Sequence, residues 1–321
     1  MSGPACPACG DGDYSPYGSY TDQEYFTPGG PYDYRQCRAC GSVFLCPLPV
    51  DRLSEIYPPN YYSYADEGGG LLGRIKSALD RRLLRDCLSR IPGRELSALD
   101  VGGGRGWMLD HMRQVEPRLK YTEVVDLDTR AGDLARSRGH AYTCRRIEEY
   151  ESPRPFDLVL LLNLIEHVES PRLVLTRLAR MLSPEGRVLV KTPNHEALDA
   201  RCFRGSYWAG LHVPRHFTVF SRESFETCLQ GTGLAIERFS HTQGGAFWAA
   251  SILAALARRG LVRISAERPA VNHPAFPFLA GLTAAFDYLR MPFARTSQMF
   301  IVLRRETPRD GTAGRTPANT R

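Results

Sequence analysis

The chain has 321 residues, a formal net charge of +6, a hydrophobic fraction of 43% and a charged fraction of 24%. These values are typical of a globular protein with one large domain plus a small one, or with two domains. No apolar run reaches the roughly 18–20 residues of a membrane span. The N-terminus lacks the basic and apolar regions of a signal peptide, so we expect a cytoplasmic protein.

Half of the net positive charge lies in one terminal segment. Residues 304–321 carry five arginines against Glu306 and Asp310, a net charge of +3. A charge excess concentrated in a tail is weak evidence for a nucleic-acid partner. The motifs, rather than the charge, must therefore indicate the function.

Two Cys-x-x-Cys-Gly motifs mark residues 1–48, at Cys6/Cys9 and at Cys37/Cys40. Each motif makes a tight turn that directs two thiolates at one point, and four sulfur ligands suit a structural Zn²⁺ site. The other five cysteines are scattered, which favours a reducing compartment over a disulfide framework. We predict a zinc ribbon over 1–48; its net charge of −3 makes it a poor binder of phosphate backbones.

A connector over 49–95 follows, where apolar spacing predicts a helix over 71–90. From Leu96 onward, strands alternate with helices. The predicted strands are 97–101, 121–126, 141–144, 156–162 and 187–192. The predicted helices are 106–115, 129–138 and 171–182. This alternation predicts an α/β fold with a parallel sheet covered on both faces, and ligands at the carboxyl ends of its strands.

A glycine loop follows the first of these strands, in the pattern Asp100-x-Gly-x-Gly-x-Gly106. A dinucleotide fingerprint would need glycine at 107, where the chain has Trp107. The loop is therefore better suited to an amino-acid or nucleoside ligand. Asp126 ends the second strand, where a carboxylate can accept hydrogen bonds from ribose hydroxyls. The alternative for Asp126 is a solvated turn residue.

These motifs, together with Phe156-Asp-Leu-Val and Leu164-Ile-Glu-His-Val168, resemble the class I S-adenosylmethionine-dependent methyltransferases over residues 96 to about 241. The resemblance implies a Rossmann-like seven-stranded methyltransferase fold over 96–305 and S-adenosyl-L-methionine as the cofactor. It also implies a set of cofactor-binding residues, namely Asp100, Gly102, Gly103, Gly104, Gly106, Asp126, Leu127, Arg146, Ile147 and Asn163.

Individual roles follow from the same resemblance. Asp100 would support the glycine loop, Asp126 would hold the ribose, and Leu127 would pack on the adenine. Arg146 falls where the family often has Asp, which is a departure at the adenine contact. Gly103 stands where the family commonly has Cys, and we interpret it as a position of free choice.

With the ribbon and the stretches Phe44-Leu-Cys-Pro-Leu-Pro49 and Ile56-Tyr-Pro, the chain resembles zinc-ribbon methyltransferases of bacterial sugar, polysaccharide and natural-product pathways. This implies a small-molecule acceptor, sugar-like or hydroxylated. The resemblance to the nucleotide-sugar C-methyltransferases is partial, because only about 80 residues follow His241.

The acceptor is expected near residues 191–220, which follow the fifth strand. This segment would place Asn194, His195, Arg215 and His216 at the mouth of the pocket. A hydroxyl acceptor must lose its proton, and histidine is the usual base near neutral pH. His216 is one candidate base, and His167 next to Glu166 is another. The alternative is that either histidine only hydrogen-bonds a loop.

Two other functions remain open, an RNA base methyltransferase that uses the ribbon and a catalytically silent cofactor-binding protein. Residues 242–297 interrupt the alternation as a helical insertion or lid, a partner-facing helix pair, a membrane-interface element, or ordinary core helices. A closing strand is expected over 298–303, and 306–321 reads as a disordered tail. Ser221 to Ser224 predicts a capping box at a helix N-terminus.

Overall fold

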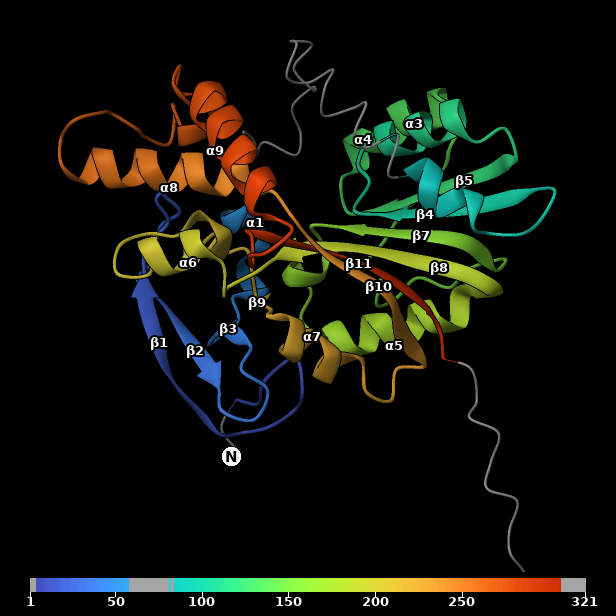
Figure 1. Ribbon diagram of the computed structural model, residues 1–321, viewed down its shortest axis with the longest axis horizontal. Helices are drawn as coiled ribbons and strands as arrows, with labels where there is room; N and C mark the ends of the chain where they lie inside the picture. The colour runs from blue at the N-terminus through green and yellow to red at the C-terminus, as the bar shows by residue number, and fades with distance from the viewer. Residues whose placement is uncertain (1–3, 58–80, 82–83, 307–321) are drawn as a thin grey trace, which may run out of the picture.

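The computed structural model describes residues 4–57, 81 and 84–306. A seven-stranded sheet crosses the molecule, with helices on both faces, and a smaller sheet lies at one end (Figure 1). Five strands of the large sheet are parallel, as the alternation predicts: β4 (Leu96–Val101), β5 (Leu119–Asp126), β6 (Ala141–Cys144), β7 (Phe156–Leu162) and β8 (Leu182–Pro193).

The strand order is β10-β11-β8-β7-β4-β5-β6. The two remaining strands, β10 (Leu234–Thr242) and β11 (Gln298–Arg305), form an antiparallel pair at one edge, and β11 is antiparallel to β8. The predicted seven-stranded α/β fold is confirmed. β8 begins at Leu182 rather than at 187, because Phe156 of β7 already pairs with Leu182.

Helices α3 (Trp107–Val115) and α4 (Thr129–Ser137) cover one face of this sheet, and α5 (Pro171–Met181) and α7 (Arg222–Leu229) cover the other (Figure 1). Side chains of β7 alternate between the two cores: Leu158 and Leu160 face one, Val159 and Leu161 the other. A strand buried on both faces reads as a continuous apolar run, which is why Phe156–Leu162 could be recognised.

The ribbon segment forms the small sheet from β1 (Tyr14–Tyr20), β2 (Tyr32–Cys37) and β3 (Val43–Leu45). A fourth strand, β9 (Thr218–Val219), comes from the chain after β8 and pairs with β3. Cys40 and Phe44 also share a buried core with β7 and β8. The ribbon is therefore built into the rest of the molecule.

Between β10 and β11 the chain forms two further helices, α8 (Gly245–Arg258) and α9 (Phe276–Arg290), which pack together beside the sheet (Figure 1). The shorter elements are η1 (Val50–Arg52), α1 (Leu53–Ile56), η3 (Ile165–His167), α6 (Leu198–Phe203), η4 (Ala209–Leu211) and η5 (Ala270–Asn272).

Some sequence predictions fall on residues that the structure does not describe. The predicted helix over 71–90 is described only at 81 and beyond 83, where 84–89 are helical and Leu84 and Leu88 are buried. The predicted tail beyond residue 306 lies outside the described residues. Within the described ranges, every helix is too short or too polar to cross a bilayer.

Candidate active site

The glycine loop connects β4 to α3 at the carboxyl edge of the sheet. Gly102 and Gly106 have φ angles of 73° and 76°, in the left-handed region that favours glycine. The Gly102 N–H donates to the Val125 carbonyl at 2.8 Å, which ties the loop to the end of β5. A Cβ at Gly106 would lie 2.5 Å from the His140 ring, so a side chain there is excluded by space as well.

The carboxylate of Asp126 connects the end of β5 to the glycine loop. Its Oδ2 accepts the Gly104 N–H at 2.8 Å, and its Oδ1 accepts the N–H groups of Leu127 and Asp128 at 2.6 and 3.0 Å. The side chain is only partly buried, so both oxygens keep lone pairs toward the edge of the sheet. Asp126 thus ties the glycine loop to the turn after β5.

Asp100 lies behind the loop and is almost completely buried. Burial, and then the negative charge of Asp126, raises the pKa of Asp100 to about 8. The structure corrects the interpretation of Gly103 as a position of free choice. A Cβ there would lie 2.4 Å from the Asp100 carboxyl, so any side chain requires that buried carboxyl to move.

The residues predicted to contact adenine lie beyond β5 and β6. The Leu127 side chain is 58% exposed, so it is free to cover a flat ring, whereas Ile147 is buried in the core. Arg146 forms ion pairs with Glu169 and, at 3.6 Å, with Glu148. The Arg146 guanidinium is therefore held by two carboxylates of the chain.

Asn163 follows β7 and has a left-handed backbone with a φ of 54°. Its Oδ1 accepts a hydrogen bond from Gln298 Nε2 at 2.9 Å, and its N–H donates to the Lys191 carbonyl at 2.7 Å. The next residue, Leu164, packs against Gly102. The turn after β7 therefore joins the glycine loop to the start of the segment 191–220, where the acceptor is expected; we call this the acceptor side.

Glu166 and His167 lie on η3, directly after this turn. Glu166 is completely buried, and its Oε2 accepts the Thr192 hydroxyl at 2.9 Å from the end of β8. Its other oxygen has no hydrogen-bond partner among the residues that the structure describes. Burial raises the pKa of Glu166 to about 8, so the carboxyl is mostly protonated at neutral pH.

Three histidines gather beside Glu166. The ring centroids of His167 and His216 are 4.6 Å apart, and that of His212 lies 5.2 Å from His216 and 6.3 Å from His167. His216 Nε2 lies 3.9 Å from Glu166 Oε1, which is beyond a hydrogen bond. The structure thus brings together all three predicted catalytic residues, Glu166, His167 and His216.

Hydrogen bonds orient two of these rings. His216 Nδ1 lies 2.8 Å from the Gly210 carbonyl, which only accepts, so Nδ1 carries the proton and Nε2 presents a lone pair. His167 Nδ1 lies 2.9 Å from the Tyr57 hydroxyl. His167 is half-buried and His216 is 3% exposed, so His167 is the more accessible of the two rings.

The rings of His167 and His216 are neutral at physiological pH. Burial, followed by the neighbouring His212 and Arg215, lowers the pKa of His167 to about 3. Burial, then His167 and His212, holds the pKa of His216 well below its ordinary value. Glu166, His167 and His216 each place one ligand atom within 4.8 Å of the others, so a neutral-histidine and carboxylate cluster of this kind could also coordinate a cation.

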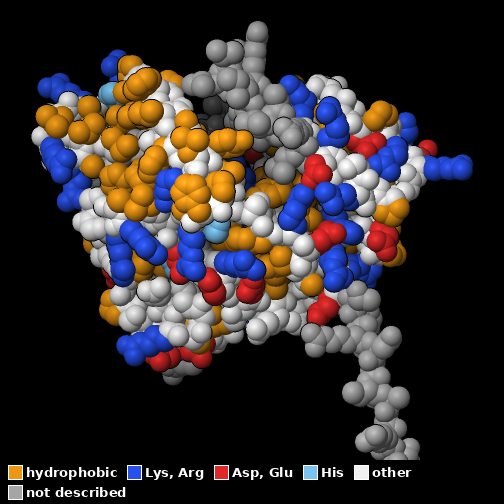
Figure 2. All heavy atoms as spheres, viewed as in Figure 1, with side chains coloured by type: hydrophobic (Ala, Val, Ile, Leu, Met, Phe, Trp, Pro, Cys, Tyr) orange, Lys and Arg blue, Asp and Glu red, His pale blue; other side chains and the backbone are white. Residues whose placement is uncertain are grey.

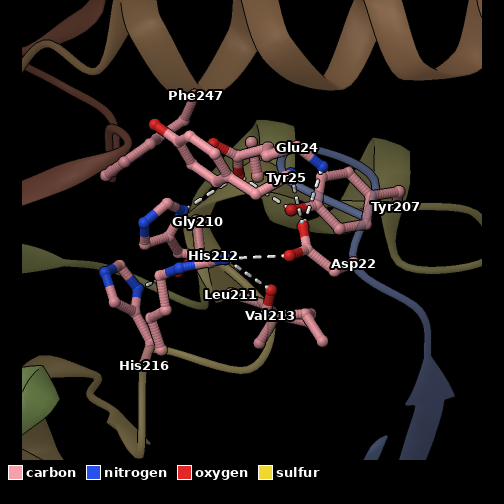
Figure 3. A network of polar contacts seen from close by, with 12 residues as sticks. Asp22, Glu24, Tyr25, Tyr207, Gly210, Leu211, His212, Val213, His216 and Phe247 are labelled. Carbon is pink, nitrogen blue, oxygen red and sulfur yellow. Dashed lines mark hydrogen bonds and ion pairs between the residues drawn. The ribbon is translucent and has the colours of Figure 1, made fainter. Parts of the chain in front are cut away.

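A turn of the ribbon holds the loop that carries His212 and His216 (Figure 3). Asp22 and Arg215 form an ion pair at 2.9 Å in which both side chains are completely buried. Glu24 accepts the Tyr207 hydroxyl at 2.7 Å and lies 3.1 Å from His212 Nδ1. The ribbon residues 22–27 therefore fix the shape of the acceptor side of the site.

The structure separates the four residues predicted at the pocket mouth. His216 lies beside Glu166 and His167, and Arg215 is buried against Asp22 of the ribbon. The Asn194 amide bonds the Thr296 carbonyl at 3.1 Å. His195 lines a different cavity of about 170 Å³, together with Tyr17 and Gln36 of the ribbon and three residues of 200–204.

The four sulfur atoms of the ribbon lie close together. Cys6 Sγ is 3.7 Å from Cys40 Sγ, and Cys9 Sγ is 3.6 Å from Cys37 Sγ. All four sulfurs lie within 4.8 Å of one another. The predicted pairing of the two Cys-x-x-Cys motifs is thus present as one cluster.

Sequence comparison gives a family. A family described as a methyltransferase domain matches residues 74–238, just over half of the chain. The ubiquinone biosynthesis O-methyltransferase of Bradyrhizobium diazoefficiens is 30% identical over 131 residues, which is 38% of this chain and 50% of the relative. That of Rhodopseudomonas palustris is 27% identical over 175 residues, 50% of this chain and 67% of the relative. The chain spans about half the length of most such relatives.

The sequence identity between this chain and similar solved structures is lower. Coclaurine N-methyltransferase bound to N-methylheliamine and SAH has 16% identity and a TM-score of 0.48, covering 80% of this chain and 81% of that one. A putative sarcosine dimethylglycine methyltransferase from Galdieria sulphuraria has 13% identity and a TM-score of 0.49, covering 72% and 87%. The family assignment rests on the match over residues 74–238.

Proposed function

The chain belongs to the class I S-adenosylmethionine-dependent methyltransferases, and on this premise we propose that it methylates a hydroxyl group of a small-molecule acceptor. The observation that carries the proposal is the cluster of His167, His216 and Glu166 at the carboxyl edge of the sheet, next to the glycine loop. The curated relatives named as O-methyltransferases support a hydroxyl as the accepting group.

The glycine loop and Asp126 are proposed to hold the cofactor. Left-handed glycines leave the backbone open to close approach, and the free lone pairs of Asp126 suit ribose hydroxyls, so the residues present fit S-adenosyl-L-methionine. When bound, the cofactor supplies an electrophilic methyl group on a sulfonium. Leu127 is proposed to cover the adenine, and Arg146 and Ile147 to border it.

His167 is proposed to take the proton of the acceptor hydroxyl. His167 is the more accessible of the two rings. Because burial lowers its pKa to about 3, this role requires that the bound acceptor raise the pKa of His167 toward neutral pH. Tyr57 orients it through Nδ1. His216 and Glu166 are proposed as positioning residues, because the His216 ring packs on His167 with centroids 4.6 Å apart and its Nε2 lies 3.9 Å from Glu166 Oε1. Much of the remaining acceleration would come from positioning the acceptor.

A labelled-methyl assay tests this function. The purified chain is incubated with S-adenosylmethionine carrying a labelled methyl group and with panels of hydroxylated aromatics, sugars and nucleotide sugars. We expect label in an alkali-stable methyl ether. His167→Ala should lower kcat by about 10²–10⁴-fold with unchanged cofactor affinity, whereas His273→Ala, outside the cluster, should have little effect. Label on nitrogen or carbon would contradict the O-methylation, and full activity of His167→Ala would contradict the base.

The four cysteines are proposed to hold a structural Zn²⁺. A tetrahedral ion with Zn–S bonds near 2.3 Å requires S···S separations of about 3.8 Å, and the observed pairs at 3.6 and 3.7 Å fit this requirement. Metal analysis should find about one zinc per chain. Cys37→Ser/Cys40→Ser should lose it, and Cys144→Ser, which changes an exposed cysteine, should retain it. A metal-free, fully folded wild type would contradict the site.

A further inference from the structure

Helix α9 exposes large apolar side chains and buries two polar ones, Thr283 and Asp287. Its outer face carries large hydrophobic residues that are 44–79% exposed, continuing one turn beyond the helix; we call these the apolar face: Phe278, Leu282, Phe286, Tyr288, Leu289 and Phe293. The only acidic residue of α9, Asp287, is completely buried. Figure 2 shows the hydrophobic side chains gathered over α8 and α9.

This inverted arrangement is fixed by the packing of α9 on α8. Asp287 accepts the Ser297 hydroxyl at 2.7 Å and the Gly244 N–H at 3.1 Å, and forms an ion pair with Arg290 at 3.2 Å. Gly245 packs so closely that a Cβ there would lie 2.2 Å from the Ala280 carbonyl oxygen. α9 therefore cannot rotate its apolar face inward without leaving Asp287 unpaired.

A basic rim adjoins the apolar face. It consists of four exposed arginines at the end of α8 and in the following loop: Arg258, Arg259, Arg263 and Arg268. Among the described residues, none of the four forms an ion pair, and Glu267 is the one acidic residue between them. The same loop exposes Leu261, at 68%, and Val262 and Ile264 pack in the same core as Phe276 of α9.

The rim also contains a hollow. It has a volume of about 710 Å³ and is lined by Arg263, Arg268 and Ser265 together with Val262 and Ile264. Guanidinium and hydroxyl donors beside apolar side chains suit a phosphate attached to an apolar chain. The hollow therefore combines basic and apolar side chains, as the basic rim and the apolar face do together.

We propose that α9 and the basic rim bind the surface of a membrane that contains anionic lipids. The apolar face would enter the boundary between headgroups and acyl chains, with the helix parallel to the surface, and the rim would contact lipid phosphates. A second copy of the chain fits the face less well, because a two-fold contact would bring two unpaired arginine rims together. This inference does not depend on which acceptor is methylated.

A single helix, α8, lies between the apolar face of α9 and the acceptor side of the site. Ser251 of α8 accepts the Ala209 N–H at 2.9 Å, and Phe247 packs on Trp208 at a ring-centroid distance of 6.4 Å. α8 thus separates the apolar face of α9 from the loop that carries His212 and His216. Membrane binding would place this loop near the bilayer surface.

Vesicle flotation of the full chain tests the proposal, with phosphatidylcholine vesicles prepared with and without phosphatidylglycerol. Binding should require the anionic lipid and weaken as salt is raised. Arg258→Gln/Arg263→Gln should weaken partitioning by about fivefold for each arginine. Leu282→Ser/Leu289→Ser should weaken it at least about tenfold through lost apolar burial. The matched control, Leu173→Ser/Arg180→Gln on α5, should bind like the wild type.

Several outcomes would overturn the proposal. One is a wild type that does not float with anionic vesicles, and another is flotation that the α9 and rim variants leave unchanged. A concentration-dependent dimer that Leu282→Ser/Leu289→Ser abolishes would assign the face to a second copy. Release by inorganic phosphate beyond that by chloride at matched ionic strength would assign the hollow to a free anion. Thermal unfolding of each variant confirms that it is folded.

Discussion

The proposed cofactor side and the proposed acceptor side of the site are built in different ways. The cofactor side comes from short contiguous pieces: the loop at 102–106, Asp126, and the turn after β7. The acceptor side joins η3 to the loop at 207–217 and to a turn of the ribbon, and its ion pair links residues 193 positions apart. A contiguous motif carries its geometry in its own sequence, whereas a site assembled from distant segments depends on the whole fold.

This difference predicts where single changes do most harm. On the cofactor side, most polar groups bond to nearby backbone, so a change should remain local. On the acceptor side, charged groups are buried, and Asp22 has its counter-charge on the distant Arg215. The first prediction therefore concerns Arg215.

Arg215→Met should destabilise the protein by about 3–5 kcal/mol, because it leaves Asp22 buried without its counter-charge. The free energy of unfolding in urea measures this effect. Asp22→Asn/Arg215→Met should recover part of the loss, since no uncompensated charge then remains. Arg222→Met is the matched control, because its partner Glu226 is about half exposed and such surface pairs contribute about 1 kcal/mol or less. If the two single variants lowered the free energy of unfolding equally, burial would not determine how much these ion pairs stabilise the protein.

Each side buries one carboxyl group whose pKa is raised, Asp100 and Glu166, and this makes stability depend on pH. The pKa of Asp100 and that of Glu166 are each raised to about 8, from ordinary values of 3.8 and 4.5. The folded state therefore holds protons that the unfolded chain has already released, so stability should fall by a few kcal/mol as the pH rises from about 4 to about 8. Urea unfolding across this range measures the change.

Two isosteric variants separate the contributions of these carboxyl groups. Asp100→Asn and Glu166→Gln should each flatten part of the dependence, since neither amide titrates. If ionised Glu166 assists His167, the rate of methyl transfer should rise as the pH rises through about 8. Glu166→Gln should abolish that rise, and Asp100→Asn should keep it. A rate profile that is the same in both variants would refute the positioning role of Glu166.

The third prediction tests the cofactor side alone. Asp126→Ala should weaken S-adenosylmethionine binding by about tenfold to a hundredfold, the range expected for hydrogen bonds to a charged group. Calorimetry measures the affinity. Asp133→Ala, at a side chain that is 94% exposed, is the control. Because Asp126 also accepts the Gly104 N–H, Asp126→Asn should retain part of the affinity. Unchanged affinity in Asp126→Ala would remove this residue from the ribose site.

What could be predicted from the sequence follows the same division. The strands, the glycine loop and Asp126 were predictable because each depends on residues within a few positions. Glu166, His167 and His216 were predicted as candidates, but their contact was not, because no sequence pattern shows that His216 folds back over η3. Asp22, Glu24 and Tyr57 were missed as parts of the site for the same reason. Gly103 was misjudged because its constraint comes from the Asp100 side chain in space.

The last prediction has the smallest expected effect. It asks whether sensitivity to substitution depends on where a residue lies in the fold or on its contact with a residue distant in the sequence. Ser221 begins α7 directly after β9, beside the acceptor loop, yet its role was predicted from a pattern of four residues. Its hydroxyl accepts the Ser224 N–H at 3.1 Å, and Ser224 Oγ accepts the Ser221 N–H at 2.8 Å. Ser221→Ala should cost about 1 kcal/mol of unfolding free energy, and Ser221→Asp should restore most of it. If Ser221→Ala were instead as damaging as Arg215→Met, sensitivity would follow location on the acceptor side rather than dependence on a distant buried partner.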